Sequence, residues 1–324
     1  MRPAMSTYAA LFPGLGSRRL RLPAGIWPLI EPDADLWEEA DDAAARLGQP
    51  PPSTTLRQWH AAGSASPLVR SPDHDIVLFT VTVALYRRVT LLGRPPDLLI
   101  GYSFGYHTAL VCAGVFSVTD AIRMLLARTT ILGECASGVS GTTMIEAGPD
   151  AAMDLVAATS HPSLVVACLN TPSRTTVSGL LGPLTAFESL AASAGIAVVR
   201  LPLSHAFHSP LMRPAVGPLR LAVDGMRQRK LQADVYSTVT GRLCRDDDDL
   251  LSDMVESIAV PVRFLDALYF ADRRRIGMFV EFAVTETLSS MVADTLPHAA
   301  SRACMTPRDD PRAALADLIT NLRT

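Results

Sequence analysis

Apolar residues follow two alternating patterns over the first 132 positions, and these patterns predict strands and helices in turn. The apolar run 8–12 ends at Pro13-Gly14, as a buried strand does where it enters a turn, and 98–100 is a second run of this kind. Acids at its start, apolar spacing and Gly48 at its end predict a helix over 33–47, and 76–90 is apolar enough for a buried helix. Two more helices are predicted after the second strand, at 106–113 and 118–132. The stretch 50–72, rich in Pro, Ser and Gly, is predicted to be a loop with short helical pieces. This alternation favours a parallel sheet covered by helices on both faces.

Residues 139–207 show a different order of elements. Strands and helices are predicted here at 143–146, 150–158, 164–169, 175–179, 184–194 and 196–201. The resulting β-α-β-β-α-β order is that of a ferredoxin-like unit. We therefore expect a large α/β subdomain made of 1–138 and 208–324, with a small ferredoxin-like subdomain at 139–207 inserted into it.

Composition narrows the class of protein. Hydrophobic residues make up 48% and charged residues 19%, which is enough for a packed core, and the net charge of -3 argues against a nucleic-acid partner. The five cysteines contain no C-x-x-C pair, so neither a disulfide framework nor a metal site is expected and a cytoplasmic location fits. No run approaches the ~20 apolar residues that a membrane span needs. We expect no membrane contact and no signal peptide, since Pro and Gly come too early in the chain.

The candidate chemistry centres on Gly101-Tyr102-Ser103-Phe104-Gly105. A serine flanked by glycines between an apolar strand and a helix is the nucleophile-elbow pattern of α/β-hydrolase-like proteins. The sharp turn places the hydroxyl at a helix N-terminus, where free N–H groups stabilise an oxyanion. We therefore expect an α/β-hydrolase-like body, although a glycine-rich turn with a capping serine would have the same sequence.

A serine nucleophile needs a base, and the chain offers seven histidines. His205 and His208 lie where the inserted subdomain rejoins the body, a suitable place for a base to meet Ser103 across a cleft. The residues alone do not decide between the two.

Several stretches resemble one family in the order in which that family has them. They are 12–17, 101–114, 170–172 with 177–179, 205–212, 236–241 and 261–264. The sequence resembles the malonyl-CoA:acyl carrier protein transacylase family, including the acyltransferase domains of polyketide synthases, and is most similar to a free-standing, trans-acting type. This family has the expected architecture of an α/β body with a ferredoxin-like insertion.

The resemblance assigns the catalytic roles. Ser103 would take an acyl group from a thioester and pass it to the thiol of a phosphopantetheine arm. His208 would be the general base and then the acid, oriented by the backbone carbonyl of Ser257. The backbone N–H groups of Leu15 and Phe104 would form the oxyanion hole.

The resemblance also implies substrate contacts. Arg128 stands where the family keeps the arginine that holds a malonyl carboxylate, and a bidentate guanidinium suits that task. The plainer alternative is a solvent-exposed helix arginine such as Arg123. His205 would be a wall of the acyl pocket, and Phe207 and Asn170 would also contact substrate.

Departures from the family pattern bear on the substrate. Tyr102 replaces the usual histidine beside the nucleophile, and Leu15 and Arg18 replace glutamines. Residues 283–285, Ala-Val-Thr, stand where the family usually has Gly-Pro-Gly near the C-terminus. Asp75 replaces a glutamine near the acyl group. A carboxylate there would either pair with Arg128 and repel a second carboxylate or accept a substrate ammonium group.

Two substrate interpretations follow. Arg128 favours malonyl or a related dicarboxylic unit, whereas Asp75, Tyr102 and Leu15 favour a carrier-to-carrier transferase for an amino-acyl, peptidyl or starter acyl group. An editing hydrolase of the same fold and a non-catalytic scaffold that binds carrier proteins are further alternatives. An unrelated α/β-hydrolase would need an acid between Ser103 and His208, for which the candidates are Asp120, Asp150, Asp154 and Glu188.

An acyl carrier protein is the expected partner, and acyl-CoA or a phosphopantetheinyl acyl carrier protein is the expected substrate. No tightly bound cofactor is expected, since the thioester brings its own activation. Arg273, Arg274 and Arg275 form the densest basic patch and would meet an acidic carrier. A solubilising loop explains the same residues.

Overall fold

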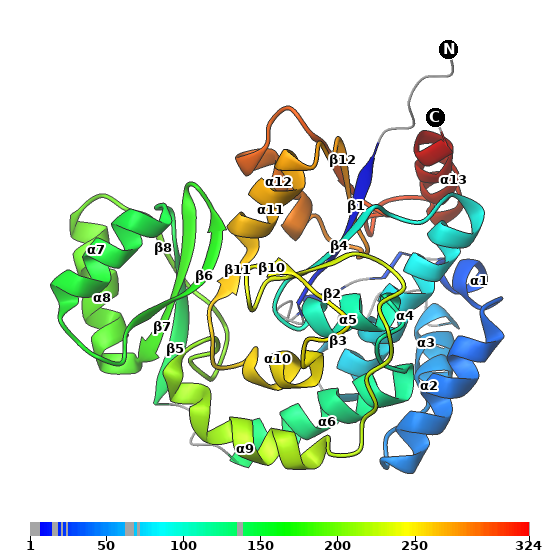
Figure 1. Cartoon of the computed structure of the whole chain (residues 1–324), viewed down its shortest axis with the longest axis horizontal. Coiled ribbons are helices and arrows are strands. Elements are labelled where there is room, and N and C mark those ends of the chain that lie inside the picture. The colour runs from blue at the N-terminus through cyan, green and yellow to red at the C-terminus, as the bar shows by residue number, and fades with distance from the viewer. Residues whose placement is uncertain are drawn as a thin grey trace.

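The computed structural model describes residues 7–14, 19–20, 22–23, 25–61, 68–69, 72–134 and 139–323. Its main sheet has the strand order β10-β9-β4-β1-β12-β13 (Figure 1). Neighbouring strands run parallel except β10, which is antiparallel to β9. The bounds are β1 Tyr8–Phe12, β4 Leu98–Gly101, β9 Val235–Ser237, β10 Arg242–Leu243, β12 Met278–Glu281 and β13 Ala300–Ala303. Strands β2 (Arg19–Leu20) and β3 (Leu68–Val69) form a separate antiparallel pair.

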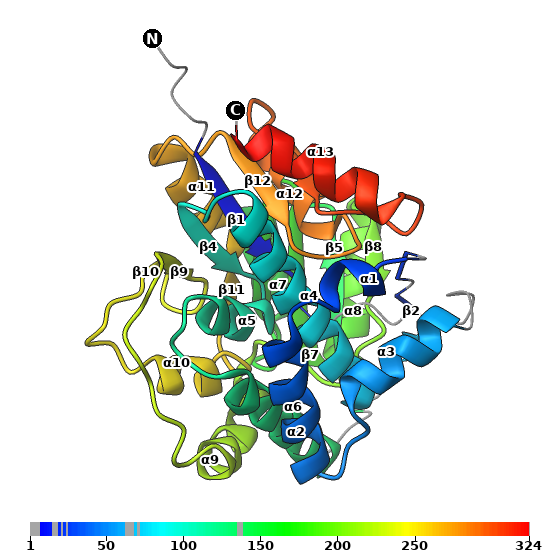
Figure 2. The same ribbon diagram turned by 90° about the vertical axis from the view of Figure 1, so that its right-hand side faces the viewer.

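Both faces of the main sheet are buried, as the apolar pattern predicts. Along β1, Tyr8, Ala10 and Phe12 belong to one hydrophobic cluster, and Ala9 and Leu11 belong to the other. Figure 2 shows the helices of the first face, which are α1 Trp27–Ile30, α2 Ala34–Arg46, α3 Pro52–Ala61, α4 Pro72–Leu92, α5 Gly105–Cys112, α6 Val118–Glu134, α9 Arg213–Ala222, α10 Leu250–Glu256 and α13 Pro311–Arg323. A 3₁₀ turn, Pro210–Met212, precedes α9. The second face is covered by α11 (Phe264–Arg273) and α12 (Thr287–Thr295).

The inserted unit has the predicted β-α-β-β-α-β order. Its elements are β5 Ser140–Ile145, α7 Pro149–Thr159, β6 Val165–Thr171, β7 Arg174–Leu180, α8 Leu181–Ser193 and β8 Val198–Arg200. Its sheet has the order β11-β6-β7-β5-β8, with α7 and α8 on the outer face (Figure 1). The added edge strand β11 (Val262–Arg263) comes from the body and runs parallel to β6, with Val262 opposite Cys168. The two subdomains therefore share one sheet.

Part of the predicted loop 50–72 is a regular helix, α3. The three consecutive prolines mask it in the sequence, yet the last of them, Pro52, is the first residue of the helix, where proline is tolerated. The backbone N–H and the hydroxyl of Ser53 donate to the Asp41 carboxylate, which ties this start to α2. Residues 62–67 and 70–71 of the predicted loop lie outside the described residues.

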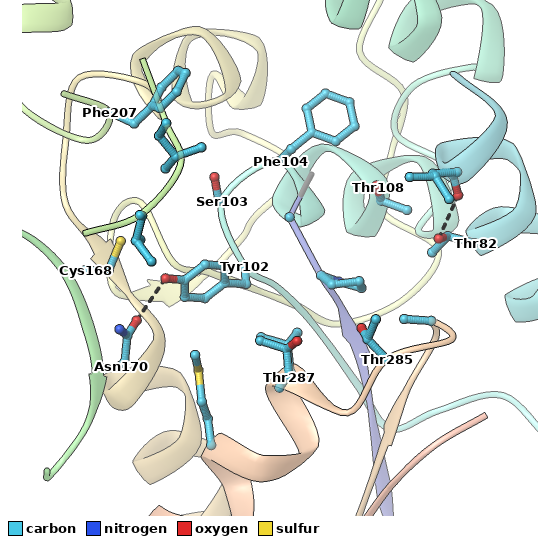
Figure 3. Close-up of a pocket in the computed structure, with 18 of the residues that line it drawn as sticks. Thr82, Tyr102, Ser103, Phe104, Thr108, Cys168, Asn170, Phe207, Thr285 and Thr287 are labelled. Atoms are coloured by element: carbon cyan, nitrogen blue, oxygen red, sulfur yellow. Dashed lines mark hydrogen bonds between the residues drawn. The ribbon is translucent and has the colours of Figure 1, made fainter. Parts of the chain in front are cut away.

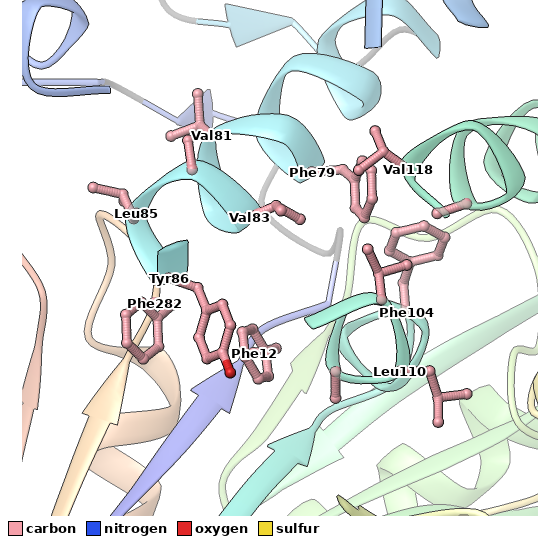
Figure 4. Packing of buried hydrophobic residues seen from close by; sticks show 14 of the residues in the cluster. Phe12, Phe79, Val81, Val83, Leu85, Tyr86, Phe104, Leu110, Val118 and Phe282 are labelled. Carbon is pink, nitrogen blue, oxygen red and sulfur yellow. The ribbon is translucent and has the colours of Figure 1, made fainter. Parts of the chain in front are cut away.

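An aromatic cluster fixes the carboxyl end of β1. Phe12 packs against Tyr86 of α4 with 5.6 Å between ring centroids and stacks on Phe282, which follows β12, at 5.8 Å (Figure 4). All three rings are buried. Pro13-Gly14 leaves this cluster directly, so the end of the strand that faces the candidate site has a fixed position.

Candidate active site

The turn after β4 is a nucleophile elbow. Ser103 has a φ of 54°, in the left-handed region that costs a non-glycine residue strain energy. The chain crosses itself so closely that a Cβ on Gly105 would lie 1.9 Å from the Phe12 carbonyl oxygen, and one on Gly101 would lie 2.2 Å from the Gly105 backbone. The two glycines of the motif are therefore steric requirements of the turn.

The structure pairs Ser103 with His208. Ser103 Oγ lies 2.9 Å from His208 Nε2, and His208 Nδ1 lies 2.8 Å from the Ser257 carbonyl oxygen. Because a carbonyl only accepts, Nδ1 carries the hydrogen and Nε2 is free to accept the serine proton. The Ser257 carbonyl thus occupies the place that a carboxylate holds in a Ser-His-Asp triad. Of the two histidines between which the sequence does not decide, His208 is the one that contacts Ser103.

Burial makes His208 a base that stays neutral. The pKa of His208 is lowered to about 4, mainly by desolvation and also by the Arg128 charge, while the hydrogen bond to Ser257 partly opposes both effects. A neutral imidazole at pH 7 is the form that accepts a proton from a serine hydroxyl.

We therefore expect nucleophile reactivity to be constant from about pH 8 to about pH 5. Below pH 4 it should fall about tenfold per pH unit, since only neutral His208 acts as a base. The rate of Ser103 labelling by an uncharged fluorophosphonate measures this directly, with circular dichroism at each pH to confirm folding. A midpoint near the ordinary histidine pKa of about 6.5 would contradict the buried environment.

A cavity of about 480 Å³ opens beside the dyad between the two subdomains. Its walls come from the turns after β1 and β4, from α4 and α6, from β6 and β7, and from the segment after β12. Figure 3 shows Ser103 and Phe207 at one side of it and Thr82 and Thr285 at the other. Most of the lining is apolar. Among the described lining residues the arginines are Arg128 and Arg174, and none is a carboxylate.

Arg128 points into this cavity from α6. It is 8% exposed, and its guanidinium carbon lies 4.8 Å from the centroid of the Phe207 ring, within the range of a cation–π contact. Its charge lowers the pKa of both His208 and His107, which shows that it lies near the dyad. The alternative of a solvent-exposed helix arginine is wrong for Arg128.

Tyr102 connects the elbow to the small subdomain across the cavity. Its hydroxyl donates to Asn170 Oδ1 at 2.9 Å, and Asn170 Nδ2 donates to Thr176 Oγ1 at 3.0 Å (Figure 3). The Tyr102 ring meets Phe264 edge-on. Desolvation keeps the Tyr102 pKa well above its usual value, so the hydroxyl is a neutral donor. Tyr102, Asn170 and Phe207 all line the cavity.

Two predicted substrate contacts, Asp75 and His205, are buried. Neither is among the described residues that line the cavity, but both adjoin residues that do. Asp75 is the fourth residue of α4, one turn before Leu78 and Phe79, which do line the cavity, and His205 packs its ring against Phe207. Phe104 is the N-cap of α5, so its N–H belongs to the free donors of that helix start. Leu15 and Arg18 lie outside the described residues.

The basic patch lies at the amino ends of the strands, away from Ser103. Arg273, Arg274 and Arg275 precede β12, and Arg274 pairs with Asp234, which precedes β9. Both positions are at the amino ends of parallel strands, whereas Ser103 follows the carboxyl end of β4. A carrier bound to these arginines would lie at the opposite ends of the strands from Ser103, so the patch is not placed to deliver a carrier to the cavity.

Sequence reasoning passed over two residues. Arg174 lines the cavity and pairs with Asp294, 3.5 Å away. His107 lies in the first turn of α5, four residues after Ser103, and contacts Ser257. A histidine at the start of the helix that follows the nucleophile is the signal that the sequence offers.

The described residues contain no group of three or more His, Cys, Asp or Glu side chains that could hold a metal ion. Within the same part of the chain no helix is both long and apolar enough to cross a membrane.

Comparisons with known proteins agree with this geometry. The family model for the acyl transferase domain matches residues 61–320. The phenolphthiocerol synthesis polyketide synthase type I Pks15/1 of Mycobacterium marinum is 30% identical over 94% of this chain, which spans 14% of that synthase. The malonyl CoA-acyl carrier protein transacylase of Bacillus subtilis is 27% identical over 89% of this chain and 90% of its own length.

Solved structures match over nearly the whole chain. The acyltransferase domain from the second module of the salinomycin polyketide synthase is 28% identical, with a TM-score of 0.82 over 97% of this chain and 72% of that one.

Proposed function

The chain belongs to the family of acyl transferase domains, and on that premise we propose that it moves a malonyl or related dicarboxylic acyl group from a thioester to the phosphopantetheine thiol of an acyl carrier protein. The observation that carries the proposal is Arg128, buried in the same cavity as Ser103. The Bacillus subtilis relative, named for this reaction, matches along nearly its full length.

The charge of the cavity favours an anionic acyl group. Arg128 and Arg174 line it, and its described lining has no carboxylate. Because Arg174 is paired with Asp294, the preference depends on Arg128, whose guanidinium an ammonium group would meet there. Amino-acyl transfer is favoured mainly by Asp75, which is buried and is not among the described residues that line the cavity, so Arg128 is the better supported contact.

The dyad performs the transfer in two steps. Ser103 Oγ attacks the thioester carbonyl as its proton passes to His208 Nε2, and the intermediate collapses by expelling the donor thiolate, which takes that proton. The carrier thiol then gives its proton to His208, attacks the Ser103 ester and releases the serine oxygen, which recovers the proton. The Phe104 N–H at the start of α5 stabilises the negative oxygen in both steps.

The substrates supply the remaining chemistry. Acyl-CoA or an acylated carrier brings an activated thioester, so the reaction needs no tightly bound cofactor. The acyl carrier protein is the proposed acceptor, and a cytoplasmic location is part of the same proposal.

Intact mass spectrometry after brief incubation with separate donors tests the proposal. We expect a stable malonyl adduct from malonyl-CoA, a weaker or no adduct from acetyl-CoA or an amino-acyl carrier protein, and release of the malonyl group when holo-carrier is added. The Ser103→Ala variant is the control for the site of attachment.

The other outcomes point to the alternatives. An adduct from the amino-acyl carrier alone would assign carrier-to-carrier transfer. Free malonate accumulating without a carrier would assign an editing hydrolase, and absence of any adduct or free acid would assign a scaffold.

A further inference from the structure

His107 is a buried histidine that the acyl-transfer steps do not use. It lies on α5, four residues after Ser103, is 1% exposed, and packs its ring 4.8 Å from that of Phe104. Its Nε2 lies 3.1 Å from the Met254 carbonyl oxygen and 3.1 Å from Ser257 Oγ.

The neighbours of His107 fix its protonation. The Met254 carbonyl only accepts, and the Ser257 hydroxyl donates its own hydrogen to that carbonyl at 2.7 Å. Both oxygens therefore accept from His107, so Nε2 carries the hydrogen. Nδ1 has no hydrogen-bond partner in the described part of the chain, and burial lowers the pKa of His107 to about 3, so the ring is a neutral, one-sided donor.

His107 and His208 are hydrogen-bonded to the same segment. Ser257 is the C-cap of α10, and its carbonyl accepts from His208 Nδ1 at 2.8 Å. The next carbonyl, that of Ile258, accepts the backbone N–H of His208, also at 2.8 Å. The position of His208 therefore depends on that of residues 257–258, because two hydrogen bonds join them.

We propose that His107 is a positioning residue that sets the catalytic base relative to the nucleophile by fastening the end of α10 to α5. The inference rests on the proposed function in that Ser103 and His208 are taken as nucleophile and base. The contacts form a closed circuit. The elbow backbone joins Ser103 to His107 in the first turn of α5, and hydrogen bonds join His107 to Ser257, Ser257 to His208 and His208 back to Ser103.

The strained backbone of the two catalytic residues explains why such a link is needed. Ser103 and His208 both have positive φ, 54° and 60°, and a non-glycine residue keeps such a conformation only where its surroundings impose it. A misplacement of about 1 Å in a catalytic group can cost about a hundredfold in rate. A rigid link between the two strained residues maintains the 2.9 Å contact between them.

The test compares His107→Phe, which removes the donor, with His107→Gln, which keeps an amide N–H at the position of Nε2. We expect His107→Phe to lower both fluorophosphonate labelling of Ser103 and kcat for malonyl loading by about 10- to 100-fold, with KM changed less than about threefold. His107→Gln should recover most of the rate. His60→Phe, at an exposed histidine on α3, is the matched control and should leave both rates unchanged.

A second variant keeps the test decisive if His107→Phe does not fold. Ser257→Ala removes the hydroxyl but keeps the carbonyl that orients His208, and it should lower the labelling rate by several-fold. In a folded double variant with His107→Phe, the two losses should not add, as for residues in one network. Wild-type rates in both single variants, no recovery with glutamine, or additive losses would overturn the inference.

Failure of the proposed function gives a different pattern. If no acyl donor loads the wild type while fluorophosphonate labelling still depends on Ser103 and His107, the proposed reaction is wrong and the positioning role stands.

Discussion

Replacing Ser103 with alanine is expected to lower carrier acylation by at least about 10⁴-fold and to abolish the covalent adduct. The reaction proceeds through an ester on this oxygen, and the carrier thiol has no other route to the acyl carbon that the dyad would activate. Alanine keeps the left-handed backbone at this position without adding bulk, so the elbow should persist.

Quenched time-course assays with labelled malonyl-CoA and holo-carrier measure this loss in the rate of carrier acylation, and intact mass spectrometry measures the adduct. The melting temperature should stay within a few degrees of the wild-type value. Transfer above about 1% of the wild-type rate in Ser103→Ala would mean direct attack by the carrier thiol, with His208 as its base.

Replacing Arg128 with alanine is expected to reverse the preference between acyl groups. Charge-assisted hydrogen bonds to a carboxylate contribute about 2–4 kcal/mol in a buried site, so malonyl loading should fall about 30- to 1000-fold. Acetyl loading should change less than about threefold, because an acetyl group, unlike a malonyl group, has no free carboxylate to offer the guanidinium. The His208 pKa should also rise, since the Arg128 charge lowers it.

Loading rates from malonyl-CoA and acetyl-CoA, measured side by side, test this selectivity. Arg123→Ala, on the same helix but only partly buried, is the matched control and should leave both rates unchanged. Equal losses with the two donors in Arg128→Ala would show that Arg128 supports the dyad rather than binding the acyl carboxylate.

Local patterns predicted much of this molecule. The elbow was found because its glycines are required by contacts within the motif itself, which a sequence displays directly. The β-α-β-β-α-β unit was found because each of its elements has its own periodicity. Both are cases in which neighbours in the chain determine the structure.

Properties that depend on the packing of distant segments were harder to predict. Whether Asp75 and His205 line the cavity depends on which side of a buried segment faces it, and both are buried behind residues that form the lining. The arginines 273–275 are basic in any fold, but only the parallel strand order shows that they lie at the edge away from Ser103. His107 acquires its role from Ser257, which is 150 residues away in sequence.

The pairing of β6 with β11 has a consequence for how the chain folds during synthesis. The inserted unit is complete in sequence at residue 207, but the strand that covers its β6 edge begins at Val262. Until that strand is made, β6 presents a row of unpaired N–H and C=O groups, and such an open edge readily pairs with strands of other chains. If the small subdomain forms on the nascent chain before that strand is made, its β6 edge is open to strands of other chains, and pairing with β11 then closes the edge at Cys168 and Leu169.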